Sequence, residues 1–454
     1  MNINQLVKDK KLKNDDIVSF TARVRTNRAG KSVGFLVVND GSTILDLQIV
    51  YKDSLKNFAE LSQLRISSVI NINGKILLTP EKEQKLEVQA SEIEILSSAS
   101  LDYPLQKKEH SLEFLREISH LRPRTKTFQS IFKIRSSAAF AIHKFFQEDG
   151  FVYVNSPIIT ENDAEGAGES FIVTTLDNGD YPKDFFGKKA CLTVSGQLNA
   201  EAYAQAFKKV YTFGPTFRAE NSNTSKHAAE FWMIEPEVAF EDLKYNIDLI
   251  ENMVKYVINY IFEVCKEELE FCDSNLENGL IDKLNLVRNS NFEKITYTEA
   301  IKILQDAVKN NHEFEESDIK FGLDLGTEHE RFICEKHFKR PIFITDYPKE
   351  IKAFYMKLNP DDKTVAATDL LVPGIGELVG GSQREDDFDK LSKRCKDLGI
   401  DTDSLSWYND LRKYGYYKSA GFGLGFERLI MYITGAGNIR DVIPFPRTPK
   451  NLLF

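Results

Sequence analysis

Residues 217–237, FRAENSNTSKHAAEFWMIEPE, contain the features that decide the fold and chemistry expected of this chain. The pattern predicts a strand that ends near Arg218, a polar loop, and a second strand that begins near Phe231. An arginine at the end of a sheet strand offers a planar fork suited to a phosphate. Lys226 and His227 in the loop suit further phosphates, and Phe231 offers a flat face for a base. The alternative interpretation is an exposed hairpin whose charges are only solvated.

Two glycine-rich blocks downstream strengthen the nucleotide interpretation. Residues 374–384, GIGELVGGSQR, place four glycines beside an acid and an arginine, which indicates backbone close to a ligand. Glu377 and Asp369 offer two carboxylates, which Mg²⁺ accepts together with phosphate oxygens. Residues 421–429, GFGLGFERL, predict a strand that runs into a helix, with Arg428 near the join. Together these blocks indicate a nucleotide site without a Walker motif.

The first hundred residues predict a small β-barrel. Runs rich in β-branched and aromatic residues are separated by turn signals, and a helix is predicted over 55–64. The predicted strands span 17–24, 34–40, 44–51, 68–77 and 85–96. This order is typical of an OB-fold, which commonly binds single-stranded nucleic acid.

The charge distribution permits an RNA partner for this barrel. The chain has a formal net charge of −9, but residues 1–105 hold 14 Lys and Arg against 13 Asp and Glu. Binding to a phosphate backbone needs a local basic surface and not a basic protein. The acidic balance of the whole chain therefore does not exclude RNA binding by its N-terminal part.

The remaining residues predict a larger domain of the α/β class, α+β type. Apolar residues recur at helical spacing from 125 to 147, so a long helix is expected before an extended piece at 151–157. Strand-like runs then alternate with helices, and this favours a mostly antiparallel sheet flanked by helices. We expect an OB-fold domain over 1–100, a connector over 101–125, and a catalytic domain over 126–454 with a helix-rich insertion at about 242–320.

Three blocks of this larger domain resemble the signature motifs of class II aminoacyl-tRNA synthetases. Residues 150–157 resemble motif 1, FRAE with EFWMIEPE resembles motif 2, and GFGLGFERL resembles motif 3. With the GELVGGSQRE block and the barrel, their order is similar to subclass IIb, which contains the aspartate, asparagine and lysine enzymes. The resemblance runs from Val18 to Pro449. It implies an enzyme that uses ATP and Mg²⁺ to activate an amino acid and charge a tRNA.

The resemblance implies a role for each matching residue of the nucleotide site. Arg218 would bind the α-phosphate of ATP, and Glu220 would bind the adenine amino group. Phe231 would stack on the adenine ring. His227 would reach the outer phosphates, and Arg428 would hold the γ-phosphate.

The resemblance also implies a metal site and a homodimer. Asp369 and Glu377 would bind Mg²⁺, and Pro157 with the preceding helix would lie in the dimer interface. A carboxylate substrate is already ionised, so the reaction needs in-line positioning and positive charge on the phosphate oxygens instead of a general base. The residues expected to be catalytic are Arg218, Glu377 and Arg428.

The choice of amino acid depends on how the site distinguishes an amide from a carboxylate. Residues 195–201, SGQLNAE, resemble an aspartate-enzyme pattern, SPQLxKQ, whose lysine pairs with the substrate carboxylate, but that position is Ala200 here. Polar mismatches of this kind can discriminate strongly. Aspartate enzymes also typically have an Ile-Asp pair where this chain has Ile-Glu. We therefore predict asparagine as the substrate, with Arg384 on its side-chain carbonyl and Glu235 on its amide. Ser195, Gln197 and Gly380 complete the expected amino-acid site.

The barrel is expected to bind the anticodon of tRNA(Asn). Phe35 and Gln48 match positions that in this subclass stack on and hydrogen-bond the central base, a uridine, and Arg25 and Arg28 would lie nearby. Stacking of an exposed aromatic ring on an unpaired base contributes about 1–3 kcal/mol. The alternative is that Phe35 belongs only to the barrel core.

Other classes of protein agree less well with the sequence. No apolar run approaches the roughly 20 residues of a membrane span, and no apolar segment follows the N-terminal charges, so we expect a cytoplasmic protein without a membrane partner. The five cysteines form no CxxC pair, which favours buried free thiols. An aspartate enzyme, strict or relaxed, is opposed by Ala200 and Glu235. A non-catalytic RNA-binding paralogue is opposed by Arg218, Glu377 and Arg428, which it would be expected to have lost.

Overall fold

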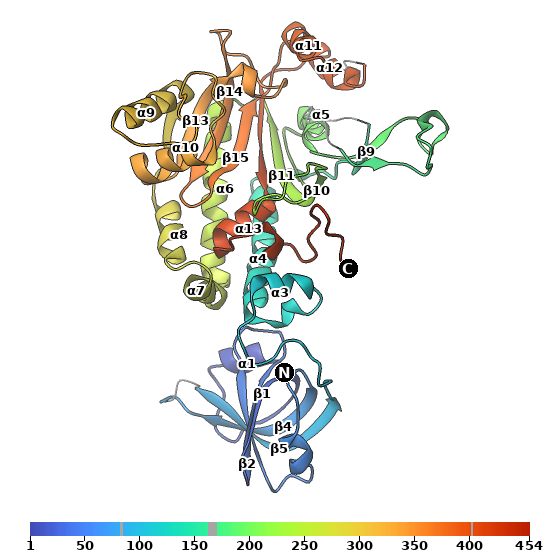
Figure 1. Ribbon diagram of the computed structural model, residues 1–454, viewed down its shortest axis with the longest axis vertical. Coiled ribbons are helices and arrows are strands. Elements are labelled where there is room, and N and C mark those ends of the chain that lie inside the picture. The colour runs from blue at the N-terminus through green and yellow to red at the C-terminus, as the bar shows by residue number, and fades with distance from the viewer. Residues whose placement is uncertain (82–84, 162–169, 401–402) are drawn as a thin grey trace. The chain divides into compact units, whose positions relative to one another are not determined.

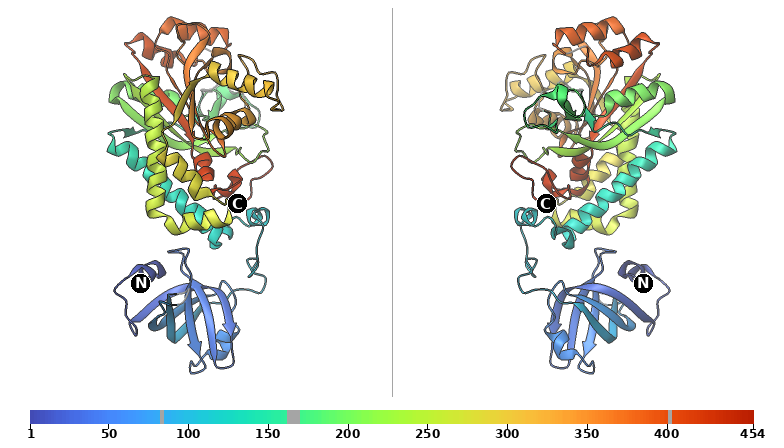
Figure 2. Two further views of the ribbon diagram at one scale, coloured as in Figure 1. Left: turned by 90° about the vertical axis from the view of Figure 1, so that its left-hand side faces the viewer. Right: turned by 90° about the vertical axis from the view of Figure 1, so that its right-hand side faces the viewer.

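The structure is a computed structural model that describes residues 1–81, 85–161, 170–400 and 403–454. The chain divides into two compact units, residues 1–130 and 131–454. The first unit is rich in strands, and the second combines a large sheet with helices (Figures 1 and 2). The predicted connector, 101–125, falls within the first unit.

The first unit is built on a closed barrel whose strands follow the order β1-β2-β3-β5-β4. Alternate residues of β1 point inward, so that Val18, Phe20, Ala22 and Val24 are buried while the residues between them are more exposed. Helix α2, Phe58–Ser62, precedes β4, and the predicted OB-fold is confirmed. The strands are β1 Ile17–Ala29, β2 Val33–Asn39, β3 Leu47–Lys52, β4 Val69–Leu78 and β5 Leu86–Ser97.

Helix α1, Ile3–Lys8, adds an element that the sequence did not predict. Asn2 accepts a hydrogen bond from the backbone N–H of Gln5, whose side chain accepts one from the backbone N–H of Asn2. This capping box stabilises the first turn. The helix buries Ile3 and Leu6 in the barrel core. The same unit contains helix α3, Leu112–Glu117, and the single turn η1, Arg122–Arg124.

In the part of the chain that the structure describes, the second unit has an eight-stranded sheet of order β12-β13-β14-β15-β16-β11-β10-β6. The outermost pairs, β12–β13 and β10–β6, are parallel, and the pairs between them are antiparallel, as predicted. The strands are β6 Val152–Tyr153, β10 Lys209–Phe217, β11 Glu230–Ala239, β12 Glu293–Thr296, β13 Ile342–Pro348, β14 Thr364–Val372, β15 Gly376–Gln383 and β16 Ser419–Gly425. A smaller sheet has the order β7-β9-β8, with bounds Ile159–Thr160, Ala190–Leu192 and Ile172–Val173.

Helices flank the main sheet (Figure 2). The helices from α4 onward are α4 Lys126–Glu148, α5 Gln197–Phe207, α6 Leu243–Val264, α7 Lys266–Asn275, α8 Leu280–Asn289, α9 Tyr297–Lys309, α10 Thr327–Arg331, α11 Phe388–Asp397, α12 Ser406–Lys413 and α13 Phe426–Thr434. The segment 242–320 is helix-rich, and it also supplies β12 to the edge of the sheet. The long helix predicted over 125–147 is α4.

Strand pairing brings the three informative sequence blocks together. The hairpin β10–β11 carries residues 217–237, and β11 pairs with β16 so that Met233 lies opposite Gly425. On its other side β16 pairs with β15, where Ser382 lies opposite Gly421. The glycine-rich strands β15 and β16 therefore lie next to the β10–β11 hairpin in the middle of the sheet.

The cysteines and the longest helices have simple environments in the described residues. All five cysteines are free and buried, as predicted. None of the helices in the described ranges is long and apolar enough to cross a membrane.

Candidate active site

One pocket contains all the residues predicted to bind ATP. It lies where the β10–β11 hairpin meets β15, β16 and the start of α13. Its lining includes Arg218, Glu220, His227, Phe231, Glu377 and Arg428. The structure thus brings together residues that are spread over more than two hundred positions of the sequence.

The loop between β10 and β11 is held by hydrogen bonds. At its base the backbone N–H of Arg218 donates to the carbonyl of Ala229 at 3.0 Å. Arg440 donates to the carbonyl of Thr224 at 3.0 Å and to the side chain of Asn223 at 2.9 Å. The guanidinium of Arg218 lies over the ring of Phe231, 5.5 Å from its centroid. The residue predicted to bind the α-phosphate, Arg218, and the residue predicted to stack on adenine, Phe231, are therefore neighbours.

Two cations meet at one end of this pocket. Arg428, in the first turn of α13, donates to the carbonyl of Glu377 at 3.0 Å. Lys226 donates to the carbonyl of Ile375 at 3.1 Å, and burial together with the charge of Arg428 lowers the pKa of Lys226. Like charges held close together are stabilised by an anion between them. This end of the pocket suits the outer phosphates of a nucleotide.

Two carboxylates converge near the glycines of β15. A Cβ added to Gly380 would lie 3.1 Å from Oε1 of Glu377 and 3.3 Å from Oδ1 of Asp369. Lys352 donates to the other oxygen of Asp369 at 2.6 Å. Burial and the charge of Asp369 raise the pKa of Glu377, and burial with the charge of Glu377 raises the pKa of Glu330 to about 7. Crowded acids are stabilised by a cation, and two carboxylates beside cationic side chains are a donor set that fits Mg²⁺ together with phosphate oxygens.

A second pocket adjoins the first and shares Arg218, Met233, Glu377 and Gly423 with it. Its lining includes all the residues predicted to bind the amino acid, which are Ser195, Gln197, Glu235, Gly380 and Arg384. Arg218 and Glu377 therefore lie between the proposed nucleotide pocket and the proposed amino-acid pocket. Such an arrangement places a carboxylate from one pocket next to a phosphate from the other.

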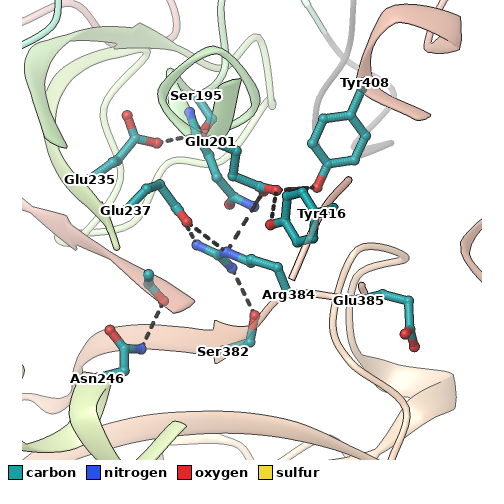
Figure 3. A network of polar contacts seen from close by, with 12 residues as sticks. Ser195, Glu201, Glu235, Glu237, Asn246, Ser382, Arg384, Glu385, Tyr408 and Tyr416 are labelled. Carbon is teal, nitrogen blue, oxygen red and sulfur yellow. Dashed lines mark hydrogen bonds and ion pairs between the residues drawn. The ribbon is translucent and has the colours of Figure 1, made fainter. Parts of the chain in front are cut away.

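The carboxylate of Glu235 is held by three neutral donors. It accepts a hydrogen bond from the hydroxyl of Ser195 (Figure 3). It also accepts from the backbone N–H of Gly196 at 2.9 Å and from the hydroxyl of Thr212 at 2.9 Å. A carboxylate has about four lone-pair sites, so one remains for a ligand. The described residues bring no cation within ion-pair distance of Glu235. Among the described residues, Glu235 is therefore held by neutral groups and has no ion-pair partner.

Arg384 is buried and already has a carboxylate partner. Its Nε and Nη2 both donate to Glu237, and its Nη1 donates to the hydroxyl of Ser382 at 2.7 Å (Figure 3). A Cβ on Gly421 would lie 2.3 Å from the carboxylate of Glu237, so this pairing requires a glycine there. A guanidinium has five N–H groups, and two of those of Arg384 remain for a ligand. Because Glu237 neutralises its charge, Arg384 is better suited to a neutral carbonyl oxygen than an arginine without a carboxylate partner would be.

One face of the barrel carries three of the four residues predicted to contact the anticodon. Arg28 and Phe35 lie opposite each other across β1 and β2, with the guanidinium 5.9 Å from the ring centroid. Gln48 lies on the same face, since it pairs with Val37 two residues along β2 from Phe35. It donates to Glu87 at 3.0 Å. Phe35 is partly exposed and lies outside the barrel core.

Arg25 has a different environment from the other three. Its guanidinium donates to the carbonyl of Arg124 and to the side chain of Gln129 at 3.1 Å, and it lies 3.9 Å from a carboxylate oxygen of Asp46. Burial lowers the pKa of Arg25. This geometry makes Arg25 a link between the barrel and the following segment, and it weakens the prediction of direct anticodon contact.

Comparison with known proteins identifies the family. Residues 111–449 match the family described as tRNA synthetases class II (D, K and N), the aspartate, lysine and asparagine enzymes. The chain belongs to this family of class II tRNA synthetases. Residues 18–96 match the OB-fold nucleic acid binding domain, in agreement with the barrel.

Curated relatives of this synthetase are similar over its full length. The asparagine–tRNA ligase of Mycoplasma capricolum is 70% identical over 454 residues, which is 100% of both chains. That of Mesoplasma florum is 62% identical, again over 100% of both chains. Among solved structures, the Pyrococcus horikoshii asparaginyl-tRNA synthetase complexed with asparaginyl-adenylate is 33% identical with a TM-score of 0.86. That alignment covers 97% of this chain and 96% of the other.

Several polar residues in or beside these pockets were missed by the sequence prediction. Glu237 lies within motif 2, but nothing in its pattern separates its role from that of Glu235. Glu201 is the last residue of the SGQLNAE block and received no role. Lys352 and Glu330 lie in segments with no recognised motif, and only their proximity to Asp369 and Glu377 makes them visible. Of these four residues, only Glu201 could have been noticed from the sequence, as an acid at a buried position of a helix.

Proposed function

We propose that this synthetase activates asparagine with ATP to form asparaginyl-adenylate and transfers the asparaginyl group to tRNA(Asn). The proposal rests on two residues that line the same pocket next to the ATP residues. Glu235 has no ion-pair partner among the described residues, and the charge of Arg384 is neutralised by Glu237. The amide of asparagine supplies N–H donors to Glu235 and a carbonyl to Arg384. An aspartate carboxylate would face Glu235 with only the already paired Arg384 at its side chain, since the lysine position of aspartate enzymes is the buried Ala200. The full-length relatives named asparagine–tRNA ligase support the same substrate.

Arg218 has the central position in the proposed mechanism. It lines both pockets, so its guanidinium reaches the α-phosphate of ATP where the asparagine carboxylate attacks. Negative charge that develops on the phosphate oxygens is stabilised by this preorganised cation. Lys226 and Arg428 bind the outer phosphates, which leave as pyrophosphate. Asp369 and Glu377 would hold Mg²⁺, whose charge would offset that on the phosphate oxygens.

The same proposal includes contact between the barrel and the anticodon of tRNA(Asn). The barrel face of Arg28, Phe35 and Gln48 binds the anticodon, with the uridine stacked on Phe35.

The chain forms a homodimer through motif 1, where β6 is an edge strand of the main sheet and Val152 is exposed. The enzyme works in the cytoplasm with the rest of translation. Light scattering coupled to size exclusion is expected to give twice the chain mass of 51.9 kDa.

Aminoacylation of a tRNA(Asn) transcript by the purified chain tests the proposed function. Radiolabelled asparagine is expected to become acid-precipitable in the presence of ATP and Mg²⁺, whereas labelled aspartate is not. Charging of tRNA(Asn) with aspartate at a comparable rate would instead identify a relaxed aspartate enzyme.

Replacing Phe35 with alanine is expected to impair tRNA charging without affecting adenylate formation. Loss of one stacked base weakens binding by about 1–3 kcal/mol, so kcat/KM for tRNA(Asn) should fall roughly 5-fold to 150-fold. ATP–pyrophosphate exchange should stay unchanged because the substitution lies in the other compact unit. Val33→Ala on the same strand is the matched control. An F35A enzyme with the wild-type KM for tRNA would contradict a stacking role.

Replacing Gly380 with alanine is expected to raise the KM for asparagine. The new Cβ would lie 3.1–3.3 Å from the oxygens of Glu377 and Asp369, in space that the ligand or metal needs. A strain of about 1–3 kcal/mol is typical of overpacking, which corresponds to about a 5-fold to 150-fold effect. Steady-state exchange at varied asparagine checks this, with the melting temperature as a control for folding. An unchanged KM would show that this space is not used.

A further inference from the structure

Glu201, on α5, is a fully buried carboxylate that the proposed mechanism does not use. It accepts hydrogen bonds from the hydroxyl of Tyr408 at 2.8 Å and from the hydroxyl of Tyr416 at 3.2 Å (Figure 3). Arg412 donates to the same carboxylate at 2.9 Å. These three donors come from α12 and from the segment before β16, more than two hundred residues away along the chain. A carboxylate ion-paired in this way acts only as an acceptor.

The same carboxylate determines which way the amide of Gln197 points. Gln197 lies one turn before Glu201 on α5, and its Nε2 donates to Oε1 of Glu201 at 3.1 Å. The reversed amide would place Oε1 of Gln197 against a carboxylate that has no proton to donate. Glu201 therefore holds the NH₂ group of Gln197 and leaves its oxygen for the pocket. Within the described ranges, no side chain donates a hydrogen bond to the amide oxygen of Gln197.

Gln197 lines the pocket that also contains Ser195, Glu235 and Arg384. Arg384 and Glu235 are occupied by the side-chain amide of asparagine under the proposed function. The α-ammonium of the substrate carries three N–H donors and requires acceptors. A fixed amide oxygen is such an acceptor, whereas the NH₂ group of a reversed amide would repel the ammonium.

We propose that Glu201 is a positioning residue that orients the Gln197 amide so that its oxygen accepts a hydrogen bond from the α-ammonium of asparagine. This inference rests on the proposed function. Oε1 of Glu201 also lies 3.8 Å from Nε of Arg384, so the same carboxylate adjoins the residue that binds the side-chain carbonyl. The effect of Glu201 on the ammonium is exerted through Gln197, whereas any effect through Arg384 would act on the side-chain amide that asparagine shares with an analogue lacking the ammonium.

A comparison of asparagine with an analogue that lacks the ammonium tests this proposal. Succinamate, which is asparagine without its α-amino group, is used as a competitive inhibitor of ATP–pyrophosphate exchange by the full chain. In E201Q the amide of Gln197 can reverse, and loss of one charge-assisted hydrogen bond should raise the KM for asparagine about tenfold or more. The inhibition constant of succinamate should stay within twofold of the wild-type value. Equal weakening of both ligands, or no change in either, would overturn the proposal.

A second pair of substitutions distinguishes positioning from a general structural role. Q197L should raise the KM for asparagine by a similar factor, and E201Q/Q197L should be no worse than Q197L alone, because both changes remove one interaction. Additive effects would overturn the proposal. If E201Q does not fold, E201Q/R412Q replaces the ion pair by two amides and is compared in the same way. Glu251→Gln is the matched control, since Glu251 pairs with Lys255 on α6 outside both pockets.

The outcome for the wild-type chain separates this inference from the proposed function. Absence of asparagine-dependent exchange in the wild type would contradict the function. Wild-type exchange with asparagine together with an unaltered ratio of the two ligand affinities in E201Q would contradict only the role of Glu201.

Discussion

The R218A enzyme is expected to lose ATP–pyrophosphate exchange almost completely. Arg218 lines both pockets and is the arginine placed to meet the α-phosphate. Removal of one preorganised donor from a transition-state site typically lowers kcat by about 10²–10³-fold, and the loss of a full charge should fall at or above the upper end. The exchange rate at saturating asparagine and ATP measures this effect. Binding of asparagine alone, followed by calorimetry, should change far less.

A matched arginine shows whether the loss is specific. Arg288 lies on α8, stacks on Phe262 and hydrogen-bonds Asn285, outside both pockets. R288A should exchange within twofold of the wild-type rate. An R218A enzyme that keeps more than a tenth of wild-type activity while R288A is also active would contradict the role assigned to Arg218.

Replacing Glu235 with glutamine is expected to have the second largest effect, on substrate choice. The substitution removes the negative charge that accepts from the asparagine amide, and it puts an NH₂ group among the donors from Ser195, Gly196 and Thr212. Leaving buried polar groups without partners costs about 1–3 kcal/mol each, so two such losses correspond to roughly 30-fold to 10⁴-fold in kcat/KM for asparagine. Aspartate should lose less, because its repulsion from Glu235 disappears. The preference for asparagine should therefore narrow.

Exchange kinetics with both amino acids measure this change in preference. Glu230→Gln is the matched control, since Glu230 begins the same strand and lines neither pocket. E230Q should keep the wild-type ratio of asparagine to aspartate activation. An E235Q enzyme whose ratio is unchanged would show that Glu235 has no part in discrimination.

The main features of the fold could be predicted because they depend on local periodicity. Alternation of apolar and polar residues located the barrel strands, and helical spacing located α4 within one residue at each end. Helix α1 was missed because six residues are too few to show a period, and because its stability comes from Asn2 and from burial of Ile3 and Leu6.

The candidate site was predictable only where a residue belonged to a recognised motif. Arg218, Glu377 and Arg428 lie in such motifs, and the structure places them in one pocket. The partners that hold the site together are set by tertiary contacts between distant positions. Arg412 reaches Glu201 across 211 residues, and a sequence pattern contains no information about such a pair.

Arg25 lies apart from the other three predicted anticodon residues because of an irregularity in strand pairing. Its place on a barrel strand close to Arg28 suggested a shared role with Phe35. The pairing of β1 with β2 shifts between Val24 and Thr26, and the guanidinium is engaged by Arg124 and Gln129 instead. Irregularities of this kind arise from the pairing of whole strands, and local composition does not reveal them.

ATP–pyrophosphate exchange by the purified chain with each of the twenty amino acids is the most direct test of the central claim. Asparagine is expected to support exchange, with aspartate and the other eighteen far weaker, because Glu235 has no ion-pair partner among the described residues and Ala200 replaces a cation. Exchange that is faster with aspartate than with asparagine would contradict the account.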